Sequence, residues 1–111
     1  ETAAKSSVEK AVKAAIQDYI NSDMEKVVAR ARATGDANKI GMALARSGRY
    51  AEARSAFAQS NSISAMHNLA NIYMIERNYS AAAAQYKKIL AKAPGNKSAA
   101  RGLSKAEYFA L

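Results

Sequence analysis

A pattern of apolar and small residues occurs twice in the sequence, with Tyr50 of the first copy 29 residues before Tyr79 of the second. The two copies read Ile40-Gly41…Leu44…Gly48-Arg49-Tyr50…Ala53…Phe57 and Leu69-Ala70…Tyr73…Arg77-Asn78-Tyr79…Ala82…Tyr86. In each copy, apolar residues at helical spacing precede a turn, and an aromatic residue after the turn is followed by an alanine and a second aromatic residue. Such a unit predicts two antiparallel helices, which cannot bury their apolar faces alone and therefore stack on neighbouring units.

The second copy resembles the tetratricopeptide repeat. Between Ile63 and Asn96, the order and spacing of the family motif are matched by Leu69, Ala70, Tyr73, Tyr79, Ala82, Tyr86 and Pro94. The chain departs from the motif at Met66, where Trp is frequent, and at Ile89, where Ala is usual. Leu103 follows Leu69 by 34 residues, which is the family period. The resemblance implies an all-α, right-handed α-solenoid of stacked antiparallel helix pairs that binds other proteins.

The helical pattern predicts one domain over residues 1–111 with about seven helices. A degenerate helix pair is expected over 1–33, because Asn21-Ser22-Asp23 interrupts the apolar stripe and Ser22 with Glu25 forms a possible capping box. A short repeat over 34–62 follows, with its second helix about one turn shorter than the family norm. A full repeat over 63–96 and a terminal helix over 97–111 complete the chain.

The composition argues against catalysis. The chain has no cysteine and a single histidine, His67, and it lacks a glycine-rich phosphate loop and a histidine pair for a metal. We therefore expect a protein that is not an enzyme and needs no cofactor or metal. No run of about 18 apolar residues exists, so no membrane span is expected. Because the first residue is Glu1 and not Met, we expect a processed or excised segment, with a preference for a bacterial cell-envelope or periplasmic protein.

The resemblance also indicates a binding surface. In stacked helical hairpins the first helix of each unit lines the concave side. The repeat register places ten candidate peptide-binding residues on or beside this side: Asn38, Lys39, Met42, Arg46, His67, Asn68, Asn71, Met74, Arg101 and Lys105. Asparagine amides pair with an extended backbone, methionines adapt to varied side chains, and Arg101 and Lys105 suit a carboxylate. Alternatively, the asparagines are ordinary solvated helix residues, the methionines pack in the core, and His67 lies on the surface without a special role.

The net charge of +8 favours acidic partners and leaves two other functions open. Six basic residues form a cluster without an intervening acidic residue: Lys87, Lys88, Lys92, Lys97, Arg101 and Lys105. This cluster is compatible with a nucleic acid or an anionic surface, although few aromatic residues lie among the lysines to stack on bases. The terminal helix, with Leu103, Tyr108 and Phe109, offers self-assembly as the other alternative. A protein or peptide partner remains the leading prediction.

Overall fold

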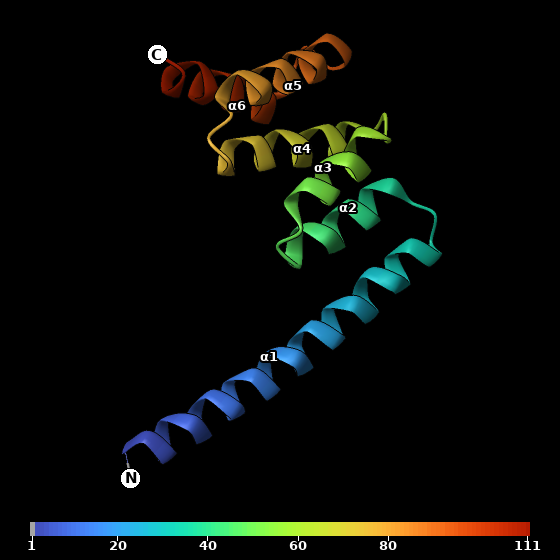
Figure 1. Cartoon of the computed structure of the whole chain (residues 1–111). Coiled ribbons are helices and arrows are strands. Elements are labelled where there is room, and N and C mark those ends of the chain that lie inside the picture. Colours follow the sequence, from blue (N-terminus) through green and yellow to red (C-terminus); the bar gives the residue numbers. More distant parts are fainter. Residues whose placement is uncertain (1) are drawn as a thin grey trace.

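The computed structural model describes residues 2–111, with side chains described from Ser7 onward, so Glu1 of the predicted leading pair lies outside the described residues. The described chain forms six helices: α1 (Thr2–Ala33), α2 (Ala37–Arg46), α3 (Tyr50–Ala58), α4 (Ile63–Ile75), α5 (Tyr79–Lys92) and α6 (Lys97–Phe109). Helices α2 to α6 stack in adjacent antiparallel pairs, and α1 extends away from them (Figure 1). The all-α helical-repeat fold is confirmed.

The predicted count of about seven helices was wrong by one, because residues 2–33 form a single helix. Asn21, Ser22 and Asp23 do not break it. None of these residues is glycine or proline, and each costs a helix interior only about 0.5 kcal/mol relative to alanine. The amide of Gln17 also donates to Asn21 Oδ1 across 2.9 Å, a contact between residues on successive turns that supports the continuous helix.

Four of the helices begin at a residue whose side chain accepts a backbone N–H, as an N-cap does. Asp36 accepts from Lys39 N, Ser62 from Ala65 N, Asn78 from Ala81 N and Asn96 from Ala99 N. These caps define where α2, α4, α5 and α6 start, and so they set the register of the residues that each helix presents.

The core depends on two aromatic rings that lie directly against glycines. Phe57 of α3 packs on Gly41 of α2, where an added Cβ would lie 2.4 Å from the ring. Tyr86 of α5 packs in the same way on Gly102 of α6, again at 2.4 Å. Both rings are almost fully buried. Ala53 and Ala82 are completely buried, as expected for positions where successive helices cross.

Three other aromatic residues of the repeat motif, Tyr50, Tyr73 and Tyr79, are only half-buried. Tyr73 packs against both clusters of buried side chains, one around α2 to α4 and the other around α4 to α6. The stack is therefore continuous from α2 to α6. Its first repeat is shortened as predicted, since α3 has 9 residues and α5 has 14.

Helix α1 joins this stack only through its C-terminal part. Val28 is buried against the first cluster, and Arg49 forms an ion pair with Glu25 at 3.3 Å. Glu52 binds Arg49 at 2.7 Å and Arg32 at 3.6 Å, which ties the same end of α1 to α3. The hydrogen bond from Arg49 lowers the pKa of Glu52, so the carboxylate stays charged at neutral pH. The earlier turns of α1 extend beyond these contacts (Figure 1). Because of this extension, the radius of gyration of the protein is 18.6 Å, whereas a compact domain of 100 residues has about 13 Å.

The turns inside the two repeats share one backbone conformation but not one residue type. Gly48 has a φ of 76°, and Arg77, at the equivalent position 29 residues later, has a φ of 61°. A left-handed conformation costs an L-residue with a side chain about 1–2 kcal/mol, whereas glycine adopts it freely. The second repeat therefore carries a local strain that the first avoids.

We expect Arg77→Gly to stabilise the protein by about 1 kcal/mol, because glycine removes this strain. Gly48→Ala is the matched reverse change, and it should destabilise by a similar amount. Urea unfolding followed by circular dichroism measures both. A lower unfolding midpoint for Arg77→Gly would mean that the arginine side chain contributes contacts that outweigh the strain.

Candidate functional site

The first helices of the two repeats, α2 and α4, are connected by side-chain amides. Asn68 of α4 donates from Nδ2 to Asn38 Oδ1 of α2 at 2.9 Å. Asn38 in turn donates to the hydroxyl of Ser64 at 3.4 Å. Since α2 and α4 also contact each other directly, these hydrogen bonds place the predicted residues Asn38 and Asn68 side by side.

Tyr86 connects α4 with α6. Its hydroxyl donates to Asn71 Oδ1 at 3.2 Å, and its ring and the His67 ring lie in an edge-to-face arrangement with the centroids 6.2 Å apart. The same tyrosine ring lies against Gly102, next to Arg101 of α6. Tyr86 therefore contacts two candidate residues of α4, whereas its contact with α6 is at Gly102, which is not one of the candidates. Burial raises the pKa of its phenol, so the hydroxyl remains protonated and able to donate well above neutral pH.

The candidate residues divide evenly between partial burial and exposure. The half-buried ones are Asn38, Met42, His67, Asn68 and Met74. The exposed ones are Lys39, Arg46, Asn71, Arg101 and Lys105. The half-buried residues thus contribute amides and thioethers near the helix contacts, while the exposed set contains four cations and one amide. This arrangement suits reversible, non-covalent contact with a polypeptide.

The structure adds an apolar trough along the seam between α1 and α2 that sequence reasoning missed. One section, of about 470 Å³, is lined mainly by Tyr19, Ile20, Met24, Val27 and Ala43. The adjoining section, of about 260 Å³, includes Arg30 of α1 together with the predicted residues Lys39, Met42 and Arg46. The apolar stripe of α1 was visible in the sequence. Its relation to α2 was not, because a helix break was expected where the trough begins.

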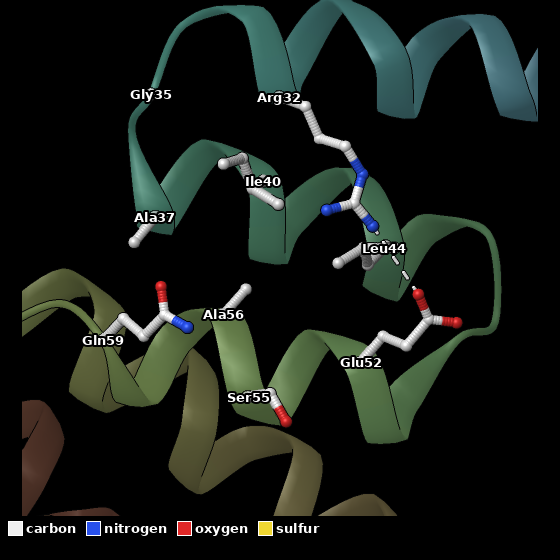
Figure 2. Close-up of a pocket in the computed structure, with 9 residues that line it drawn as sticks. All are labelled: Arg32, Gly35, Ala37, Ile40, Leu44, Glu52, Ser55, Ala56 and Gln59. Atoms are coloured by element: carbon white, nitrogen blue, oxygen red, sulfur yellow. Dashed lines mark ion pairs between the residues drawn. The ribbon is translucent and has the colours of Figure 1, made fainter.

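A second pocket lies between α1, α2 and α3 and has a volume of about 310 Å³. Ile40, Leu44 and Ala56 line it with apolar groups, and the guanidinium of Arg32 reaches across one side toward Glu52 (Figure 2). The equivalent pocket in the next repeat measures only about 120 Å³ and is lined by Met66, where the first repeat has Ala37. The larger pocket is thus explained by a small residue at a position that the second repeat fills, and we interpret it as a packing gap.

Comparison with known protein families identifies the repeat. The family model described as the tetratricopeptide repeat matches residues 62–93, which span α4 and α5. Residues 62–93 are therefore similar to a tetratricopeptide repeat, and the match indicates a protein-interaction repeat module. No curated protein matches the chain significantly.

Within the described residues, no cluster of three or more histidine, aspartate or glutamate side chains is placed to hold a metal ion. No helix of the described part is long and apolar enough to cross a membrane.

Filling the packing gap should stabilise the first repeat. We expect Ala37→Met to raise the free energy of unfolding by about 0.5–1.5 kcal/mol, because the added side chain covers Ile40 and Leu44 as Met66 covers its own repeat. Ala51→Met, at an exposed position of α3, serves as the control and should have little effect. Urea unfolding midpoints compare the two. Equal midpoints would show that the pocket is not a stability defect.

The Tyr86 hydroxyl should contribute to stability in a pH-dependent way. Because burial raises the pKa of Tyr86 in the folded state, its contribution is complete below the ordinary tyrosine pKa of about 10 and is lost as the pH rises through the folded value. We expect Tyr86→Phe to cost about 0.5–1.5 kcal/mol at about pH 8, through loss of the bond to Asn71, and less at about pH 11. Tyr108→Phe, an exposed control, should change neither. A cost that is the same at both pH values would contradict the role of the buried phenol.

Proposed function

We propose that residues 1–111 act as one non-enzymatic repeat domain that binds an extended segment of a protein partner along the face formed by α2, α4 and α6. The observation that carries this proposal is the pair of side-chain bridges across that face. Asn38 and Asn68 join α2 to α4, while Tyr86 of α5 donates to Asn71 of α4 and packs on Gly102 of α6, which links α4 to α6 through α5. Because these contacts exist without a ligand, a partner would find polar groups already in place and would lose less conformational entropy on binding.

The chemistry of this face favours an acidic segment with some apolar side chains. Arg46, Arg101 and Lys105 are exposed, and guanidinium groups pair well with carboxylates. Met42 and Met74 are half-buried, so they offer adaptable apolar contacts beside the charged groups. The exposed amide of Asn71 can pair with backbone groups of the bound segment.

The two alternatives receive less support. The basic cluster is spread over the exposed surfaces of α5 and α6, and Lys92 already donates to the backbone oxygen of Asn61 at 2.9 Å. In α6, Ser104 and Glu107 take the places held in α4 by Ala70 and Tyr73, where a second helix of the unit would pack, and both are exposed. A polar surface there is a poor basis for assembly through the terminal helix.

The proposal is tested by selecting peptides from a random library displayed on phage against the wild-type chain, and then measuring the affinity of a synthetic, fluorescein-labelled copy of the selected peptide. We expect the double variant Asn71→Ala, Arg101→Ala to bind it at least about tenfold more weakly, a loss of about 1.4 kcal/mol or more. The matched control, Lys87→Ala with Lys88→Ala, alters the outer surface of α5 and should bind normally.

Since Asn71→Ala also removes the acceptor of the Tyr86 hydroxyl, helicity and melting temperature are measured for every variant. Arg101→Glu with Lys105→Glu leaves that hydrogen bond intact and should weaken the affinity as well. Unchanged affinity in both groove variants would place the site elsewhere. Loss of binding in the Lys87 and Lys88 control, with a steep salt dependence and affinity for an oligonucleotide, would favour the polyanion function.

A further inference from the structure

The projecting part of α1 carries an apolar stripe without a partner in the described structure. Val8, Val12, Ile16 and Tyr19 recur at spacings of three and four residues, so they lie on one face of the helix. They are 62%, 51%, 54% and 71% exposed. The fold of α2 to α6 does not require this stripe, because α1 joins the stack through Val28 and the ion pairs near its C-terminal end.

Charge is distributed unevenly between α1 and the rest of the chain. Residues 1–33 contain six basic and five acidic residues, whereas residues 34–111 contain eleven basic and four acidic ones. Two bodies formed by α2 to α6 therefore repel each other, while two α1 helices have almost balanced charge. Any self-association of this chain is electrostatically least costly through α1.

The spacing of the stripe is symmetric about Ile16. Val12 and Ile20 lie four residues to either side of it, and Val8 and Met24 lie eight residues to either side. When two copies of such a helix run antiparallel with Ile16 at the two-fold axis, Val12 lies level with the partner's Ile20 and Val8 with the partner's Met24, while Tyr19 lies level with the partner's Lys13. This is the self-complementary pattern of an isologous interface.

We propose that the protein forms a homodimer through antiparallel pairing of two α1 helices, with Ile16 at the two-fold axis. Val12 of each protomer packs beside the partner's Ile20, and Val8 packs beside the partner's Met24. Ile20 and Met24 also line the larger section of the apolar trough between α1 and α2, so the partner's helix covers one end of that trough. The interface is thus continuous from the projecting stripe to the body.

The charge distribution selects the antiparallel arrangement. In a parallel pair, the two basic bodies would lie side by side at the same end of the helices. In the antiparallel pair they lie at opposite ends, separated by more than the Debye length of about 8 Å at physiological salt. The same distribution argues against an anionic lipid surface as the partner of the stripe. Helices that bind such surfaces carry a basic polar face. Residues 7–23 have no such face, because they contain only two basic residues and three acidic ones.

Analytical ultracentrifugation of the wild-type chain over a wide concentration range tests the proposal. We expect a monomer–dimer equilibrium, with a dissociation constant that rises at least about tenfold for Ile16→Glu. Ala14→Glu places the same charge on the opposite face of the same helix and should leave the equilibrium unchanged. Because residue 16 lies outside the folded stack, circular dichroism should show similar melting of α2 to α6 in both variants.

Cysteine cross-linking tests the orientation, and the absence of native cysteine makes the result unambiguous. A mixture of the Val12→Cys and Ile20→Cys variants should form a mixed disulfide on oxidation, while Val12→Cys alone should not form a dimer. Efficient cross-linking of Val12→Cys alone would indicate parallel helices and overturn the arrangement. A wild type that remains monomeric at every concentration would overturn the dimer. If that monomer bound anionic vesicles and the Ile16→Glu variant did not, the stripe would be assigned to a lipid surface.

Discussion

The packing of an aromatic ring directly on a helix backbone is the constraint on which the stack depends. Phe57 on Gly41 and Tyr86 on Gly102 bring their helices closer than a pair of larger side chains would allow, because an added Cβ would lie 2.4 Å from either ring. The first contact closes a helix pair within one repeat, and the second joins one repeat to the next helix. The fully buried alanines at 53, 65, 70, 82, 99 and 106 extend the same close approach along the stack.

Much of this fold could be predicted from the sequence, because the repeat spacing determines which residues face each other. Phe57 and Tyr86 are buried as expected, and Asp36 caps α2. The helix break near Ser22 could not be judged correctly from local signals, since the same polar residues are common at caps and tolerated inside long helices. For the candidate site, the helix face and its residues remain a prediction from the repeat register. The hydrogen bonds between Asn38 and Asn68 and between Tyr86 and Asn71 depend on how far the helices are apart, which spacing along the chain does not specify.

Helix α1 combines two roles that usually belong to separate elements. Its C-terminal end is part of the core through Val28, and its ion pairs with Arg49 and Glu52 fix the direction in which it leaves the body. Those ion pairs are exposed, and exposed pairs contribute little to stability. Their importance is directional, because a helix of 32 residues converts a small change of angle at its base into a large displacement of Val8.

Tyr86 couples the interior of the stack to the proposed binding face, since its side chain is nearly buried and yet donates its hydroxyl to the exposed Asn71. The chain contains six tyrosines and no tryptophan, so tyrosine emission is not masked by an indole. A molecule that bound at Asn71 would change the environment of this phenol, one of the six tyrosines, so tyrosine emission offers a readout of occupancy that needs no attached dye.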